Sequence, residues 1–377
     1  MRSMASQNTK WAHRYQEDVE RSYTLPNTYY TNPEVLAEER EAIFFKNWIC
    51  VGHQEKVAKP GDYFTTLILD QNILIAKGKD DVIRAFYNVC PHRGHELASG
   101  EGNKAIFSCP YHAWTFQLDG KFNNGRAVRQ MKDFNEQEAC LRPVKLEVFF
   151  NFLFINLDPQ AVPLRQMMPG LEEEIRGRVP ELDRLTLAHR TSYTIKANWK
   201  NVVDNYLECH HCVIAHPQLV ELVDMSNYRV ETFDYHIKQT GTGKQRLGCE
   251  LAVGEGKDAV ETYASYWLWP TLALDIMPGE PGLIMMYMIP DGPEQTIEHL
   301  EFYYLQKEPT EEGWANIEYQ DKILTPEDIE LVESVQRGLH SRGYVDGRYV
   351  VDQLRSSISE HGVHHFHGLV LKALGAL

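Results

Sequence analysis

Two short cysteine–histidine motifs place the strongest constraint on how this chain can fold. Cys90-Pro91-His92 and Cys109-Pro110-Tyr111-His112 are separated by sixteen residues. Side chains at this spacing can bind a metal only if two neighbouring loops bring them together. The sequence therefore predicts a frame of strands that presents two adjacent loops carrying two thiolates and two imidazoles. A Cys2His2 set of this kind could also hold tetrahedral zinc.

The residues around these motifs favour strands. Segments 63–69, 72–76 and 82–87 are rich in β-branched and aromatic residues, and short polar turns separate them. The apolar window 144–157 is interrupted by Glu147 and Asn151, which is typical of two paired strands. Residues 41–160 are therefore expected to form a small antiparallel β domain, after an N-terminal arm and helix at 1–40.

A second group of metal-binding side chains follows in a predicted helix at 201–212. A helical period puts Asn201, Asp204, Asn205, Glu208 and His211 on a single stripe. His216 comes directly before Pro217, where the helix should already have ended. One imidazole on the last turn and another just past it can converge on a single ion. The alternative is a polar helix flank with two surface histidines.

The first pair of motifs resembles the Rieske iron–sulfur proteins. Each motif has Cys first and His second, and each carries a Cys-Pro step. In Rieske proteins two cysteines hold one iron of a [2Fe–2S] cluster and two histidines hold the other. Carried over by position, Cys90 and Cys109 would bind one iron, and His92 and His112 the second.

Together, the two groups of residues resemble the Rieske non-haem iron oxygenases over nearly the whole chain. The resemblance implies an α+β chain whose catalytic domain, residues 161–377, has an antiparallel sheet flanked by helices. It assigns His211 and His216 to a mononuclear Fe(II). Glu208 would be the carboxylate that bridges to the cluster of a neighbouring subunit, because the family's two metals are too far apart within one chain. Many members have Asp at the bridge, and Asp204 is an alternative for that role.

The third iron ligand is expected to be Asp328. It belongs to a predicted helix at 326–339, with Thr325 as its N-cap. Glu327 is expected to face water. A buried carboxylate needs compensation, which a metal ion could give, although Asp328 could instead complete a capping box with Thr325. Asp328 heads an apolar stripe within about 60° of it on the helical wheel, formed by Leu331, Val332, Val335 and Leu339.

Four segments, 86–95, 198–209, 331–336 and 359–362, look like the oxygenase components for carnitine, glycine betaine and stachydrine. This resemblance implies a monooxygenase that uses O2 to hydroxylate a C–H bond next to the nitrogen of a quaternary ammonium compound. The product would lose formaldehyde or split at the C–N bond. Aromatic faces attract such cations. The predicted pocket aromatics, which could equally be core, are Tyr206, Trp267, Trp269 and Tyr287.

Two alternatives remain open. The chain could be a ring-hydroxylating oxygenase for an aromatic compound, with the same aromatics as stacking walls, or a Rieske electron carrier without catalysis. The clustered histidines near the C-terminus could suggest a third metal, but the family binds none there, and we expect interface or supporting roles. These residues are His361, His364, His365 and His367.

Charge and composition limit the partners. A net charge of −15 argues against nucleic acid or an anionic membrane, and neither a signal peptide nor an apolar run long enough to span a bilayer is visible. The seven cysteines do not form a secreted disulfide pattern, so a cytoplasmic location is expected. Without a dinucleotide fingerprint, electrons must come from a separate reductase. The family resemblance implies that this reductase is a flavin–ferredoxin protein that uses NAD(P)H and FMN. The family also implies a homotrimer.

Overall fold

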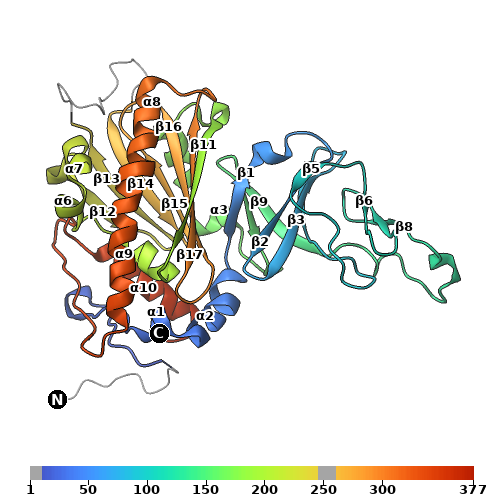
Figure 1. The fold of residues 1–377 in the computed structure, drawn as a ribbon, viewed down its shortest axis with the longest axis horizontal. Coiled ribbons are helices and arrows are strands. Elements are labelled where there is room, and N and C mark those ends of the chain that lie inside the picture. Colours follow the sequence, from blue (N-terminus) through green and yellow to red (C-terminus); the bar gives the residue numbers. More distant parts are fainter. Residues whose placement is uncertain (1–10, 245–259) are drawn as a thin grey trace. The chain divides into compact units, whose positions relative to one another are not determined.

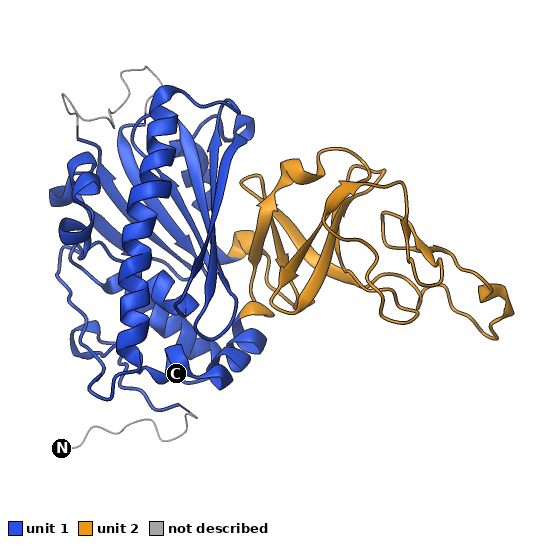
Figure 2. Cartoon of the chain, in the orientation of Figure 1, with its two compact units in different colours: residues 1–43, 167–377 blue, residues 44–166 orange. Residues whose placement is uncertain are grey.

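The computed structural model of the protein describes residues 11–244 and 260–377. The chain divides into two compact units (Figure 2). Unit 2 is residues 44–166, and unit 1 combines the N-terminal segment up to residue 43 with residues 167–377. Among the described helices, none has both the length and the apolar character needed to cross a bilayer.

Unit 2 is an antiparallel β domain, as the sequence predicts. A seven-stranded sheet has the order β1-β10-β9-β4-β3-β2-β5, and a small sheet has the order β6-β7-β8. The strands are β1 (Ile49–His53), β2 (Asp62–Ile68), β3 (Gln71–Lys77), β4 (Ile83–Tyr87), β5 (Glu101–Asn103), β6 (Phe107–Ser108), β7 (Thr115–Phe116), β8 (Phe122–Asn124), β9 (Pro143–Phe149) and β10 (Phe152–Asn156).

The β9–β10 hairpin shows why the window 144–157 forms paired strands. Phe149 pairs with Phe152, and the two residues between them, Phe150 and Asn151, both have positive φ. Two-residue turns of this kind match the twist of an antiparallel pair. Every residue of β10 is buried, which explains why its sequence is almost continuously apolar.

Unit 1 is built on a second antiparallel sheet, which is seven-stranded in the part of the chain that the structure describes. Its order is β11-β17-β16-β15-β14-β13-β12. The bounds are β11 (Thr186–Ile195), β12 (Arg229–Thr232), β13 (His236–Thr242), β14 (Thr262–Leu268), β15 (Leu272–Ile276), β16 (Gly282–Pro290) and β17 (Thr296–Tyr304).

Helices flank this sheet, and Figure 1 shows α8 and α9 lying end to end across it. The α+β prediction of a β domain plus a helix-flanked sheet is therefore confirmed. The helices are α1 (Thr28–Thr31), α2 (Pro33–Glu39), α3 (Leu164–Met167), α4 (Leu171–Arg178), α5 (Trp199–Tyr206), α6 (Cys212–Ala215), α7 (Pro217–Leu222), α8 (Glu311–Tyr319), α9 (Thr325–Leu339) and α10 (His361–Ala373).

Two predicted helix boundaries are wrong. The helix expected at 201–212 ends at Tyr206, because the Glu208 carboxylate accepts the backbone N–H groups of His210 and His211 and closes a turn there. Thr325 is not an N-cap. A π-helical turn, η7 (Gln320–Leu324), joins α8 to α9, and Thr325 has helical φ and ψ. Such π turns inside helices often occur at functional sites.

Candidate metal centres

The two cysteine–histidine loops of unit 2 are closed by matching hydrogen bonds. The Cys90 N–H donates to the carbonyl of His95, and the Cys109 N–H donates to the carbonyl of Trp114. In return, the N–H groups of Gly94 and Ala113 donate to the carbonyls of Cys90 and Cys109. Each loop therefore turns back on its own cysteine.

The side chains of these loops fit a two-iron cluster better than a zinc ion. Cys90 and Cys109 are almost completely buried, and the rings of His92 and His112 lie 4.6 Å apart. The His112 Nδ1 atom is buried and has no hydrogen-bond partner, as expected of an atom that binds a metal. Zinc would gather all four ligand atoms around one point. Among the described residues, a group converging on one point occurs at His211, His216 and Asp328 instead.

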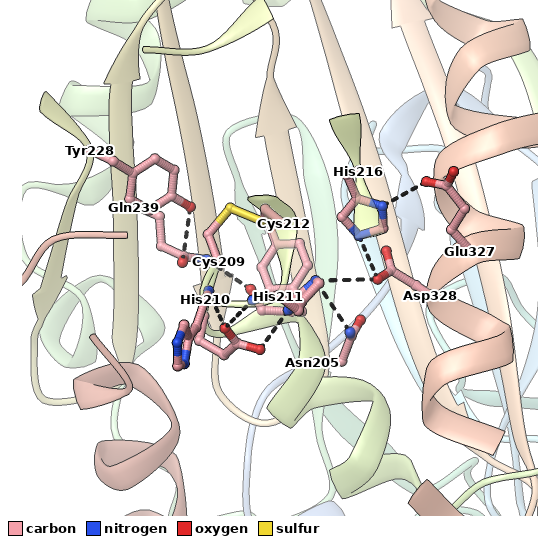
Figure 3. Close-up of a disulfide and its surroundings, with 12 residues drawn as sticks. Asn205, Cys209, His210, His211, Cys212, His216, Tyr228, Gln239, Glu327 and Asp328 are labelled. Atoms are coloured by element: carbon pink, nitrogen blue, oxygen red, sulfur yellow. Dashed lines mark hydrogen bonds and ion pairs between the residues drawn. A yellow bond between two sulfur atoms is a disulfide. The ribbon is translucent and has the colours of Figure 1, made fainter. Parts of the chain in front are cut away.

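In unit 1, the histidines of the second group lie where short helices meet. His211 is the N-cap residue of α6, and His216 links α6 to α7. A disulfide between Cys209 and Cys212 closes the turn between α5 and α6 (Figure 3). The cysteine count did not predict this bond, although the Cys-x-x-Cys spacing is a signal that could have found it.

The three predicted iron ligands, His211, His216 and Asp328, form a triad whose ligand atoms lie close together. The His216 Nε2 atom lies 2.9 Å from Asp328 Oδ1, and His211 Nε2 lies 3.4 Å from the same oxygen. The ligand atoms of the three residues all lie within 4.8 Å of one another. Two imidazole nitrogens and one carboxylate oxygen are the donor set of non-haem Fe(II) sites, which keep positions open for further ligands. The residues present therefore fit a mononuclear iron.

The other ring nitrogen of each triad histidine, Nδ1, donates its N–H to a carboxylate. His211 Nδ1 lies 2.5 Å from Glu208 Oε1. His216 Nδ1 lies 2.7 Å from Glu327 Oε2 (Figure 3). Such contacts fix the orientation of a metal-binding imidazole. The expectation that Glu327 faces water is wrong: η7 and α9 turn it toward His216. The sequence offered no signal for this contact, because it depends on how α9 lies against α6 and α7.

The carboxylates determine the charge of the site. Burial acts to lower the pKa of His211, but Asp328 and Glu208 outweigh it and raise that pKa to about 10. Burial similarly acts to raise the pKa of Asp328, and contact with the two histidines lowers it overall. The site thus concentrates negative charge around two imidazoles, which favours a bound cation.

Comparison with known proteins shows which protein family the chain belongs to. Residues 182–376 match the family described as ring hydroxylating alpha subunit (catalytic domain), and residues 47–135 match the Rieske [2Fe-2S] domain. The chain belongs to this family of Rieske oxygenase alpha subunits. It is a Rieske non-haem iron monooxygenase, as the sequence predicts, and the electron-carrier alternative is set aside because the catalytic domain is present.

Individual relatives of this Rieske oxygenase are similar over almost their full length. The chain is 41% identical over 351 residues to the carnitine monooxygenase oxygenase subunit of Escherichia coli K12, covering 93% of each. A solved structure of a quaternary ammonium Rieske monooxygenase, studied for carnitine oxidation and inter-subunit electron transfer, matches with a TM-score of 0.88 and 38% identity, covering 97% of this chain and 99% of the other. The structure of CntA with L-carnitine matches with a TM-score of 0.86, 38% identity and the same coverage.

A cavity of about 90 Å³ adjoins the triad of this oxygenase. Of the four predicted pocket aromatics, Tyr206 lines it. Trp267 and Trp269 pack edge to face against each other, with Phe366 beside them, and the Tyr287 hydroxyl donates to Glu301. The cavity has further polar and aromatic walls that sequence reasoning missed: Tyr228, Tyr263, Asp275 and Glu298.

The alternative bridging residue, Asp204, has a different environment from Glu208. Its carboxylate accepts the Tyr30 hydroxyl at 2.7 Å and contacts His367 Nε2 at 2.9 Å. His367 is therefore a supporting residue, and His364 likewise contacts the carbonyl of Gln16. Among the described residues, the C-terminal histidines do not form a metal cluster.

The apolar stripe of α9 is only partly buried, which corrects the helical-wheel prediction. Val332 and Leu339 are buried, whereas Leu331 is 37% exposed and Val335 is 52% exposed. These two side chains line an open cavity of about 420 Å³, which also reaches Asp204, Glu208 and His211. The side of α9 next to Asp328 is therefore partly exposed and forms one wall of this open cavity beside the triad.

Proposed function

We propose that this chain is the terminal oxygenase of a two-component monooxygenase whose substrate is a carnitine- or betaine-like quaternary ammonium compound. It would use O2 and reductase-supplied electrons to hydroxylate a C–H bond next to nitrogen. The similarity to carnitine monooxygenase and to CntA with bound L-carnitine supports this substrate class.

One observation in this chain carries the proposal. The described residues that line the cavity beside the triad include three tyrosines and no lysine or arginine. Tyrosine faces and carboxylates attract a cation, whereas a benzoate-like anion would be repelled. The carboxylates lining it are Glu208, Asp275, Glu298 and Asp328.

The side chains divide the chemical work. His211, His216 and Asp328 would hold the iron, which supplies reductive activation of O2 when bound. Glu208 and Glu327 keep each histidine's Nδ1–H occupied, which would leave the Nε2 atoms to bind the iron. The product carries a hydroxyl beside nitrogen, and this carbinolamine collapses by losing formaldehyde or by splitting the C–N bond.

Electron supply would involve the two cysteine–histidine loops of unit 2. Cys90, Cys109, His92 and His112 would hold the [2Fe–2S] cluster, fed by a separate flavin–ferredoxin reductase that uses NAD(P)H and FMN. We propose that Glu208 links His211 to a cluster histidine of a neighbouring subunit in a homotrimer. The contact between Glu208 and His211, and the position of both on the open cavity beside α9, support this role. A cytoplasmic location would fit this electron supply.

Substrate-dependent O2 consumption tests the proposal. The holoprotein, supplied with a reductase and NADH, is given L-carnitine, γ-butyrobetaine, choline and glycine betaine, and in parallel benzoate and salicylate. We expect O2 uptake coupled to formaldehyde or to released amine with at least one ammonium compound. Coupled turnover of the aromatic acids alone would reject the proposal in favour of an aromatic-ring oxygenase.

A further inference from the structure

One of the carboxylates in the cavity beside the triad, Asp275, is bonded by neutral hydroxyl groups. Asp275 lies on β15, lines the cavity and is 5% exposed. The Tyr206 hydroxyl donates to its Oδ1 atom at 2.7 Å, and the Ser265 hydroxyl donates to the Tyr206 oxygen at 2.6 Å. These are hydroxyl contacts, which solvate a carboxylate only in part and do not neutralise it.

Two other buried carboxylates of unit 1, Glu39 and Glu301, have cationic partners. Glu39 pairs with Lys200 at 2.6 Å, and Glu301 lies 3.6 Å from Arg190. Glu298, which also lines the cavity, differs from Asp275 because burial and the charge of Asp328 raise its pKa to about 8, so its uncharged form prevails at neutral pH. None of the ion pairs within residues 11–244 and 260–377 includes Asp275. Burying an unpaired charge is costly, and an uncompensated carboxylate in a binding cavity marks a place where a cation can bind.

Asp275 keeps its charge near neutral pH. Burial raises its pKa to about 6, and the hydrogen bonds from Tyr206 and Ser265 oppose this rise. Because the pKa stays below 7, most Asp275 side chains are ionised at neutral pH. The carboxylate is not a ligand of the triad, so its charge remains available to a substrate.

Three tyrosines surround the same space. Tyr206, Tyr228 and Tyr263 line the cavity together with Asp275, and the rings of Tyr228 and Tyr263 stack with centroids 6.1 Å apart. Gln239 fixes two of them, since its side chain accepts the Tyr228 hydroxyl and donates to the carbonyl of Tyr206. Aromatic faces alone attract a cation modestly, and a carboxylate behind them adds a full charge.

We propose that Asp275 is the specificity residue that makes this oxygenase select a permanently charged ammonium group over a neutral group of the same shape. The inference rests on the proposed function and deepens it. It assigns to Asp275 the charge recognition that shape cannot give, because a tert-butyl group and a trimethylammonium group fill the same volume.

Two pairs of shape-matched probes test the assignment. γ-Butyrobetaine is compared with 5,5-dimethylhexanoate, and choline with 3,3-dimethylbutan-1-ol; within each pair, carbon replaces the charged nitrogen. Binding to the holoprotein is measured by anaerobic calorimetry. We expect wild type to prefer the ammonium member of each pair, and Asp275→Asn to lower this preference roughly tenfold or more. Binding of the neutral 3,3-dimethylbutan-1-ol should change little, whereas binding of the anionic 5,5-dimethylhexanoate should not weaken.

Three variants make the result specific to the charge of Asp275. Asp275→Glu should keep the cation preference, and Asp275→Ser provides a second neutral variant if Asn does not fold. Glu301→Gln is the matched control, because Glu301 is a buried carboxylate bonded by two tyrosine hydroxyls in the same sheet, away from the cavity lining. Its cation preference should equal that of wild type.

The outcomes separate the inference from the proposed function. Equal weakening of choline and 3,3-dimethylbutan-1-ol binding in Asp275→Asn and Asp275→Ser would show that Asp275 only holds Tyr206 in place, and would overturn the assignment. A wild-type protein that binds neither cation would contradict the proposed substrate class itself, and the assignment with it.

Discussion

Glu327 and Asp328, which are neighbours in sequence, contact opposite nitrogen atoms of the His216 ring. Glu327 Oε2 lies 2.7 Å from Nδ1, and Asp328 Oδ1 lies 2.9 Å from Nε2. The first turn of α9 thus offers His216 both a carboxylate that orients it and a carboxylate that would share its metal. Because His216 is 2% exposed, water cannot replace either partner easily.

Replacing Glu327 should weaken iron binding without removing a ligand. We expect Glu327→Ala to lower the affinity for the mononuclear iron about 10- to 100-fold, the usual cost of losing a partner that orients a metal-binding histidine. Glu327→Gln should cost less, since its amide oxygen can still accept the Nδ1–H. Chelator competition monitored by iron analysis measures both.

Glu330 provides the control on the same helix, because it is exposed and lies one turn further along α9. Glu330→Ala should leave iron affinity unchanged. An affinity for Glu327→Ala equal to that of wild type would mean that the contact with His216 does not orient the ring.

Glu208→Gln separates electron transfer from iron binding. The variant should keep the visible spectrum of the cluster and the full iron content, while steady-state turnover falls by at least about 10²-fold because the bridge is neutralised. Stopped-flow oxidation of the reduced cluster, with substrate and O2 present, measures the step directly. Asp204→Asn is the comparison, and loss of the mononuclear iron in Glu208→Gln would contradict the bridging role.

The candidate metal-binding residues could be proposed from sequence because short spacings and the family resemblance indicate them. Cys90-x-His92 and His211 to His216 are local patterns, and the helical period places Asp328 on the side of α9 that meets them. The contacts of Glu327 and Asp275 could not be predicted, because each depends on how elements distant in sequence pack together. The predicted helix ends were also wrong, because the turn closed by the Glu208 carboxylate and the π-helical turn before Thr325 replace regular helical hydrogen bonds with local ones.

Asp328→Ala should remove the mononuclear iron and leave the cluster. Without the carboxylate, two histidines remain, too few to retain a ferrous ion against dilution. Iron content should therefore fall from about three to about two per chain, with the cluster's absorption unchanged. Loss of the cluster absorption as well would show that the two sites do not fold independently, and unchanged iron content would exclude Asp328 as a ligand.

The buried pair of Glu39 and Lys200 should govern the stability of unit 1. Both side chains are fully buried, the Lys200 Nζ atom lies 2.6 Å from Glu39 Oε1, and the Trp199 indole N–H donates to the other oxygen at 2.9 Å. Burial acts to raise the pKa of Glu39 and to lower that of Lys200, and each charge opposes the shift of the other. Removing one partner leaves an uncompensated charge.

Lys200→Met or Glu39→Gln alone should therefore cost about 3–5 kcal/mol of unfolding free energy, whereas the double variant should recover much of this loss. Thermal unfolding followed by circular dichroism should show a fall on the order of 10 °C in Tm for each single variant. Single variants that unfold at the temperature of wild type would show that water or a proton compensates the remaining charge.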